Sequence, residues 1–354
     1  MAPLARRVIA AARALTTPLL PEDFVSVWRP LRSKRAPGAR VVDVRRETAD
    51  ATTLLLRPGR SLPVHQPGQF VGLGVQVDGV WTWRSYSITS RPGDPLLAVT
   101  VTAVPGGLVS TRLAHHTTPG TLVRISEPAG DFLLPAATPE KLLFVTAGSG
   151  ITPVMGMLRT LAARNPAALD GAVHVHSDRA ADDVVFGPEL RTLAARTGLR
   201  LVERHTATQG RLCPDALTDL VPDWTARHTW ACGPADMLDD LTDHWDRVGD
   251  PGALHVERFR PPTWDDATGT GGRVTFAASG VTADAGEGEP LMAAGEAAGA
   301  LLPAGCRMGI CHTCVGPLRS GAVRDLLTGD THDTAGQPVR TCVSAPLGGV
   351  TIDL

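Results

Sequence analysis

Several features are scarce in this chain of 354 residues. It has one tyrosine, a formal net charge of only −2, and no apolar run approaching the about 20 residues that a membrane span needs. Without a positive balance, the chain as a whole offers no case for nucleic-acid binding. Six cysteines in a chain this long are too few for a disulfide scaffold. We find no internal repeat and no long low-complexity tract, and the length predicts two or three domains of about 150 residues.

Four of the six cysteines lie near the C-terminus. Three fall in the run Cys-Arg-Met-Gly-Ile-Cys-His-Thr-Cys and the fourth in Arg-Thr-Cys-Val, a spacing typical of plant-type [2Fe–2S] sites. Gly309 has no Cβ and lets the loop wrap close to the inorganic sulfides. A zinc site or two disulfides are the alternatives, but zinc sites usually repeat a short Cys-x2-Cys pair, and here the pair is not repeated. The predicted cluster ligands are Cys306, Cys311, Cys314 and Cys342.

Cysteines that bind iron need a reducing compartment, and the N-terminus agrees with that expectation. Arg6 and Arg7 precede five apolar residues, but Arg13 interrupts this run, which is too short for the apolar core of a signal peptide. We therefore expect a cytoplasmic protein.

Residues 1–40 form a basic extension, with eight Lys and Arg side chains against Glu22 and Asp23. The first fifteen residues favour a short basic amphipathic helix, and later prolines prevent long regular structure. The extension has two interpretations. It is a solvated arm, or residues 1–36 dock on an anionic membrane surface or a membrane-bound acceptor, which would place the protein peripherally at the inner face of the membrane.

The hydrophobic pattern changes along the chain. Residues 41–137 hold short apolar runs separated by turn signals, which predict an antiparallel barrel or sandwich. In residues 138–259 apolar runs alternate with helical stretches, which predicts a parallel sheet covered by helices on both faces. Residues 260–272 resemble a linker, and residues 273–354 contain the cysteine loop.

A glycine turn follows the first apolar run of the second region. Gly148-Ser149-Gly150-Ile151-Thr152-Pro153 stands between an expected strand and an expected helix. Glycines let the backbone approach a pyrophosphate, and the helix N-terminus offers free amides. An ordinary strand-to-helix turn is the alternative.

Three further motifs carry groups that suit a nucleotide or flavin. Arg84-Ser85-Tyr86-Ser87 combines a cation for a phosphate, a ring that can stack, and a hydroxyl for a reactive ring nitrogen. Residues 105–111 pair two glycines with hydroxyls, which suits a phosphate cradle or a turn with a helix cap at Ser110. Cys232-Gly233-Pro234 ends an expected sheet strand, where ligands of parallel α/β folds bind, although a structural cysteine is the default there.

Taken in order, these motifs resemble the ferredoxin–NADP reductase superfamily, in the subgroup with a C-terminal plant-type ferredoxin domain. The resemblance covers residues 41–354 and includes the marker Glu257-Arg258-Phe259. It implies a multidomain β plus α/β plus α+β fold: an antiparallel flavin-binding β-barrel of six strands, a parallel-sheet nicotinamide-nucleotide domain and a β-grasp ferredoxin domain. It also implies FAD rather than FMN.

The resemblance also implies roles for individual residues. The flavin would be held by Arg84, Ser85, Tyr86 and Ser87, and its pyrophosphate by Gly107 and Ser110. The nicotinamide nucleotide would be bound by Gly148, Gly150, Thr152, Pro153 and Gly233, with Phe259 near the far face of the flavin. Hydride transfer would involve Ser87 and Cys232.

The predicted electron path runs from NAD(P)H to the flavin, then to the cluster, then to an external acceptor. The donor stays NADPH or NADH, because Ser177 and Arg179 suit a 2′-phosphate while Asp178 opposes it through charge. A solvated loop is the alternative for these three residues. Cys213 has no role that the sequence indicates.

A narrower resemblance concerns the acceptor. Leu15-Thr16-Thr17-Pro18-Leu19 and Arg45-Arg46-Glu47-Thr48-Ala49-Asp50-Ala51 are similar to actinobacterial electron-transfer partners of membrane acyl-CoA desaturases. We therefore expect a membrane fatty acyl desaturase as the acceptor. The alternatives are a reductase component of a soluble oxygenase or cytochrome P450, a redox carrier or sensor without turnover, and a zinc-stapled flavoprotein.

Overall fold

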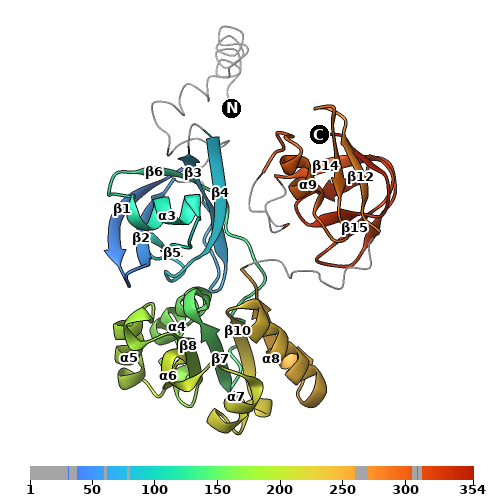
Figure 1. The fold of residues 1–354 in the computed structure, drawn as a ribbon. Helices are drawn as coiled ribbons and strands as arrows, with labels where there is room; N and C mark the ends of the chain where they lie inside the picture. The colour runs from blue at the N-terminus through green and yellow to red at the C-terminus, as the bar shows by residue number, and fades with distance from the viewer. Residues whose placement is uncertain are drawn as a thin grey trace, which may run out of the picture.

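The computed structural model describes residues 31, 38–59, 62–77, 80–259, 270–304, 309 and 313–354 of the chain. The predictions for most of the N-terminal extension, for most of the linker, and for Cys306 and Cys311 concern residues outside these ranges. The described residues form three bodies in chain order, a barrel, an α/β layer structure and a small mixed-sheet domain (Figure 1).

The first body is a closed antiparallel barrel. Its elements are β1 (Gly38–Arg46), β2 (Ala51–Pro58), β3 (Phe70–Val77), β4 (Val80–Ser87), β5 (Leu97–Thr102), α3 (Leu108–His115) and β6 (Leu122–Ile125). The strand order is β4-β3-β6-β1-β2-β5, and a bridge between Ile88 and Val99 joins the two ends. Leu54, Leu56 and Leu73 point into one core, and Val109 of α3 packs into the same core.

The second body is a parallel sheet with helices on both faces. Its strands are β7 (Leu142–Ala147), β8 (Val173–Asp178), β9 (Arg200–His205), β10 (His228–Cys232) and β11 (Leu254–Glu257), in the order β11-β10-β7-β8-β9. Its helices are α4 (Ile151–Arg164), α5 (Gly187–Arg196), α6 (Thr206–Gln209), α7 (Pro214–Leu220) and α8 (Ala235–Val248). Helices α4 and α5 contribute to the core on one face, and α7 and α8 to the core on the other. Because both faces are covered, β7 is apolar along most of its length.

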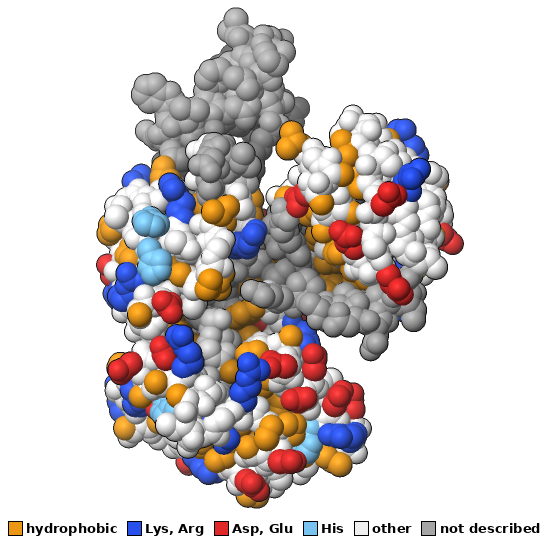
Figure 2. Space-filling view, in the orientation of Figure 1, with side chains coloured by type: hydrophobic (Ala, Val, Ile, Leu, Met, Phe, Trp, Pro, Cys, Tyr) orange, Lys and Arg blue, Asp and Glu red, His pale blue; other side chains and the backbone are white. Residues whose placement is uncertain are grey.

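Helix α8 shows how composition sets the helix faces. It buries Leu238, Leu241 and Trp245 against the sheet and turns its aspartates to solvent, and acidic side chains gather at the lower right of Figure 2, where α8 lies. At 14 residues, α4 and α8 are the longest helices of the described ranges. Within those ranges, none of the helices has the length and apolar character needed to cross a membrane.

The third body is a mixed sheet with a small companion sheet. Its elements are β12 (Gly272–Phe276), β13 (Val281–Ala285), α9 (Leu291–Ala297), β14 (Val315–Ser320), β15 (Val323–Asp325), β16 (Thr331–His332), β17 (Pro338–Arg340), β18 (Ser344–Pro346) and β19 (Val350–Ile352). The sheet orders are β13-β12-β19-β14-β17 and β16-β15-β18. Strands β12 and β19 pair in parallel and the other neighbours antiparallel, so the two ends of this domain meet in its centre.

The structure differs from the sequence-based expectations mainly in short elements. Strand β1 begins at Gly38, inside the expected extension, and β12 begins at Gly272, inside the expected linker. The sequence patterns described above do not mark the short strands β15 to β18. Strands β15 to β18 have two or three residues each, and such strands are defined by distant pairing rather than by local periodicity.

The barrel and the parallel sheet share an interface. Phe132 and Leu134, which follow the barrel strands, belong to the same apolar cluster as helix α4. Arg159 of α4 donates to the carbonyl of Thr89 at 2.7 Å, and Trp230 Nε1 donates to the carbonyl of Leu133 at 3.1 Å. These contacts hold the ends of the parallel strands against one side of the barrel.

Candidate functional site

A cavity of about 470 Å³ opens between the barrel and the parallel sheet, within the usual size range of cofactor pockets. Strands β4 and β5 and the start of α3 form one wall, and the glycine turn after β7 and the end of β11 form the other. The lining residues are Phe70, Arg84, Ser85, Tyr86, Ser87, Thr100, Thr102, Val104, Gly107, Leu108, Val109, Ser110, Ser149, Thr152, Glu257 and Phe259.

Strand β4 brings its motif to the cavity with polar atoms that lack partners. Tyr86 Oη and Ser85 Oγ are buried without a hydrogen bond in the structure, as is Thr102 Oγ1 of β5 on the same wall. Burial raises the pKa of Tyr86 strongly, with Arg84 opposing, so the phenol stays neutral and can donate. Buried hydroxyls are normally paired. These three therefore fit a bound group with acceptors, such as a flavin.

The start of α3 forms a tight turn. Ser110 Oγ donates to the carbonyl of Gly107 at 3.2 Å and accepts from Val104 N at 3.3 Å. The helix begins at Leu108 with Gly107 as its N-cap, so the alternative that Ser110 caps the helix is wrong. A Cβ on residue 107 would lie 2.4 Å from Ser110 Oγ and 2.6 Å from a Val104 methyl, so the turn requires glycine.

The predicted phosphate turn leads directly from β7 into α4. Gly148 has a φ of +53°, in the left-handed region that favours glycine. A Cβ on Gly150 would lie 2.1 Å from the carbonyl oxygen of Cys232, so the turn touches the end of β10. Thr152 Oγ1 donates to Ser149 O at 2.9 Å. Pro153 stands in the first helical turn, where its missing N–H leaves no bond unmade. The turn therefore offers amides at the edge of the cavity.

Cys232 and Glu257 are register partners on neighbouring parallel strands, β10 and β11. Burial, and next Glu257, raise the pKa of the Cys232 thiol well above its ordinary value, so it remains a neutral thiol. It is fully buried and is not among the residues that line the cavity. Gly233 follows it, and a Cβ there would meet Met237 at 2.6 Å.

Glu257 is a candidate that sequence reasoning missed, since only Phe259 received a role from its motif. Burial, and next the charge of Asp131, raise the pKa of Glu257 to about 7. It lines the cavity, and it can therefore hold or release a proton there near neutral pH. The feature that singles out Glu257 is its position beside Cys232 on the neighbouring strand. That position is known only from the strand register of the structure.

The end of β8 carries the residues predicted at a 2′-phosphate. Ser177 is buried at 4% exposure. Arg179 is 69% exposed, and its guanidinium lies 3.1 Å from Asp183 and 3.5 Å from Asp50 of the barrel. These two residues do not line the cavity, so a coenzyme would have to extend past the glycine turn to reach them.

In the third domain, two predicted ligands converge. Cys314 Sγ and Cys342 Sγ are buried 3.2 Å apart, too far for the S–S bond of about 2.05 Å and close enough to share one metal ion. Cys306 and Cys311 lie outside the described residues. Gly309 has a φ of +76°, and a Cβ there would lie 2.8 Å from a Val343 methyl. The loop therefore needs glycine at this position, and the donor set fits an iron–sulfur cluster.

An ion pair between Arg340 and Asp325 supports the cysteine loop. Arg340 donates to the carbonyl of Gly309 at 2.8 Å and to Asp325 at 2.5 Å. Asp325 is 2% exposed and also accepts from the backbone N–H groups of Leu327 and Thr328. The charged pair is thus satisfied, and it ties the loop to β15 and β17.

Comparison with known proteins gives matches along the whole chain. Family models match for the oxidoreductase FAD-binding domain over residues 42–133, the oxidoreductase NAD-binding domain over residues 144–243, and the 2Fe-2S iron-sulfur cluster binding domain over residues 274–347. The chain is 49% identical to an NADPH oxidoreductase of Mycobacterium tuberculosis, over 99% of this chain and 92% of that protein.

The chain belongs to the family of FAD- and [2Fe–2S]-dependent NAD(P)H oxidoreductases.

One further relative and one solved structure of similar fold match most of the chain. The glycine betaine monooxygenase reductase subunit of Pseudomonas aeruginosa is 31% identical over 89% of this chain and 94% of its own length. The crystal structure of phthalate dioxygenase reductase covers 90% of this chain and 97% of its own, with a TM-score of 0.62 and 21% identity. The predicted three-part fold is confirmed, as are the oxidoreductase activity and the predicted cofactors FAD, [2Fe–2S] and NAD(P)H.

The oxidoreductase brings its predicted site residues together unevenly. The flavin motif, the α3 turn, Thr152 and Phe259 share one cavity. Gly148, Gly150, Pro153, Cys232 and Gly233 are not among the residues that line that cavity, although Gly150 closely approaches the end of β10. Cys213 is exposed just before α7, apart from both groups.

Proposed function

We propose that this oxidoreductase takes hydride from NADPH at the cavity between the barrel and the parallel sheet, and delivers single electrons from its cluster to an external protein acceptor. The main observation in support of this proposal is that residues of the flavin motif and of the glycine turn line one cavity. The chemistry that FAD supplies when bound is the conversion of a two-electron donor into two one-electron steps. The chain's own residues bind, orient and shield the reacting groups.

Within the cavity, each wall has a distinct proposed task. Tyr86 and Ser87 orient the flavin ring by hydrogen bonding, and Arg84, exposed at the rim, meets a phosphate. Gly107 and Ser110 shape the turn that receives the pyrophosphate. On the opposite wall, Glu257 borders the place where the nicotinamide ring would react, with Cys232 beside it on β10, and Phe259 would cover the flavin face.

Two observations support NADPH as the donor. Arg179 presents an exposed guanidinium at the end of β8, where nucleotide-binding folds recognise the 2′ position of the ribose. The mycobacterial relative, 49% identical, is named an NADPH oxidoreductase. In the site proposed here, a 2′-phosphate would take Arg179 from Asp50 and Asp183, while Ser177 stays buried beside it.

Turnover of the purified holoprotein tests this proposal. Anaerobic mixing with NADPH should bleach the flavin absorbance first and produce the electron paramagnetic resonance signal of the reduced cluster afterwards. A protein that oxidises neither NADPH nor NADH would instead be a redox carrier or sensor without turnover, and the proposed function would fail.

For the acceptor, we propose a membrane fatty acyl desaturase. Support comes from the residues that resemble desaturase partners, at 15–19 and 45–51, and from the alignment with the mycobacterial oxidoreductase, whose 99% coverage takes in most of the basic extension. An oxygenase or a cytochrome P450 is the second candidate, supported by relatives named as monooxygenase reductase subunits. The two acceptor classes require different surroundings, a membrane and solution.

Reconstitution separates the two acceptors. With a desaturase in vesicles, the full chain should support turnover, and removal of residues 1–36 should lower it while ferricyanide reduction by NADPH stays intact. Turnover with a soluble oxygenase that exceeds turnover with the desaturase would favour the second candidate. An unchanged desaturase rate after truncation would exclude a docking role for the extension.

A further inference from the structure

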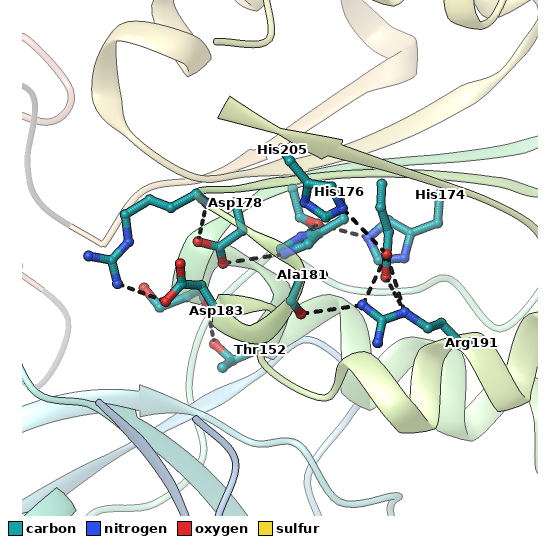
Figure 3. A network of polar contacts seen from close by, with 12 residues as sticks. Thr152, His174, His176, Asp178, Ala181, Asp183, Arg191 and His205 are labelled. Atoms are coloured by element: carbon teal, nitrogen blue, oxygen red, sulfur yellow. Dashed lines mark hydrogen bonds and ion pairs between the residues drawn. The ribbon is translucent and has the colours of Figure 1, made fainter. Parts of the chain in front are cut away.

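Strand β8 carries a polar row that the proposed function does not yet use. His174 and His176 lie at 0% exposure in the sheet, on the face that holds Phe144, and Asp178 follows them on the same face at the strand end (Figure 3). Strands of a parallel sheet are usually apolar on both faces, because helices cover them. Burying two imidazoles is unfavourable unless their nitrogens form hydrogen bonds, so the bonding partners of these nitrogens decide the state of the row.

The hydrogen bonds of the row define the position of one ring proton. Thr146 Oγ1 lies 2.8 Å from His174 Nε2 and 2.8 Å from His176 Nδ1, and a hydroxyl has a single proton to donate. Burial, and next His176, hold the pKa of His174 well below its ordinary value, so His174 is neutral. Its Nδ1 has no partner, and an unbonded nitrogen lone pair is more tolerable there than an unbonded N–H. His174 therefore donates to Thr146, and Thr146 donates to His176 Nδ1.

This arrangement directs a proton toward Asp178. Because His176 Nδ1 accepts, the proton of this ring is on Nε2. This nitrogen has no hydrogen-bond partner and faces Asp178 Oδ2 at 3.7 Å, so the contact is electrostatic. The other carboxylate oxygen, Oδ1, accepts from the backbone N–H of Arg179 at 2.8 Å. Asp178 is only 11% exposed and is turned inward, as Figure 3 shows. The adjacent Arg179 side chain is 69% exposed and turned outward.

The consequence concerns which coenzyme is accepted. In parallel nucleotide-binding folds, an acidic residue after the second strand bonds the ribose 2′-OH of NAD, whereas an arginine accommodates the 2′-phosphate of NADP. Both residue types stand side by side here. We propose that His176 is a positioning residue for coenzyme selectivity: it holds Asp178 inward, so that the 2′-phosphate meets Arg179 without the added negative charge of Asp178. This inference rests on the proposed use of NADPH.

Two substitutions at residue 176 test the contact itself. His176→Asn can still bond Thr146 but is too short to reach Asp178, whereas His176→Gln places its amide nitrogen near the position of Nε2. We expect His176→Asn to lower the ratio of kcat/KM for NADPH over NADH about tenfold, since a freed carboxylate repels the phosphate. His176→Gln should restore most of the ratio. Ferricyanide serves as the electron acceptor, so that the cluster and the partner protein do not influence the measured rates.

Two controls separate positioning from general damage. His174→Asn removes the other imidazole that bonds Thr146 but does not touch Asp178, so the ratio should stay at the wild-type value. Adding Asp178→Asn to His176→Asn removes the freed charge and should return the preference for NADPH. A structural defect alone would lower kcat/KM for both coenzymes equally and leave the ratio unchanged.

The outcomes distinguish this inference from the function it rests on. A wild-type enzyme that prefers NADH overturns both the proposed donor and the inference. A wild-type preference for NADPH that persists in His176→Asn overturns the inference alone. Should that variant not fold, Asp178→Glu decides, because its longer side chain carries the carboxylate past His176 and should lower the same ratio. An unchanged ratio in Asp178→Glu would then refute the role of the contact.

Discussion

The two redox regions of this chain are encoded in different ways. Three of the four predicted cluster ligands fall within nine consecutive residues, 306–314, and the fourth, Cys342, follows β17 far along the chain. The cavity between barrel and sheet draws its walls from four separated segments, around residues 70–87, 100–110, 149–152 and 257–259. A local motif holds its ligands through one loop, whereas a dispersed site depends on how two domains pack. Substitutions should therefore act locally in the first region and across domains in the second.

The largest effect is expected for a substitution in the cysteine loop. Cys342→Ser removes one of two convergent ligands, so the cluster should be lost and electron delivery to a protein acceptor should fall at least a hundredfold. Because the flavin site is built from other segments, ferricyanide reduction by NADPH should remain close to the wild-type rate. Iron content, visible absorbance and the two activities measure this. A parallel loss of ferricyanide reduction would show that the two regions are not independent.

Gly150→Ala tests the dispersed site at the point where its segments touch. The new Cβ would fall 2.1 Å from the carbonyl of Cys232, so the phosphate turn and β10 must separate. We expect a loss of about 2–4 kcal/mol in the free energy of unfolding and a large drop in flavin reduction by NADPH.

Gly349→Ala is the matched control, because a Cβ there meets nothing within 4 Å. It should change the unfolding free energy by less than about 0.5 kcal/mol. Equal effects of the two substitutions would contradict the close approach as the cause. Thermal unfolding and stopped-flow reduction of the flavin provide both readings.

The smallest effect is expected in the pH dependence of the unfolding free energy, through Glu257 of the cavity. The pKa of Glu257 rises from 4.5 to about 7 in the folded protein, so folding favours the protonated carboxyl. This stabilisation is fully present below pH 4.5 and is lost as the pH rises through about 7, by at most about 3 kcal/mol. Glu257→Gln stays neutral and should remove this loss. The difference in unfolding free energy between wild type and variant, measured from pH 4.5 to 8, should change across this window, and a flat difference would contradict the raised pKa.

Features set by neighbouring residues in the sequence could be predicted, whereas features set by distant residues could not. The antiparallel strands of residues 41–137 and the parallel sheet with helices of residues 138–259 were predicted correctly as classes of structure, because apolar periodicity and turn signals mark them. Strands β15 to β18 of the third domain, with two or three residues each, were not predicted, since only distant partners define them. The boundaries of the domains and the roles of individual site residues stay predictions, as does the desaturase as acceptor.

The sequence by itself determined the cofactor classes and the order of the domains, because cysteine spacing, glycine turns and apolar periodicity are local properties of the chain. Only the tertiary structure placed Glu257 opposite Cys232 and turned Asp178 inward toward His176 while Arg179 faces outward. Strand register and side-chain burial decide such pairings, and both arise from contacts between residues far apart in sequence. The coenzyme choice and the proton holding that we propose therefore depend on packing that no single motif contains.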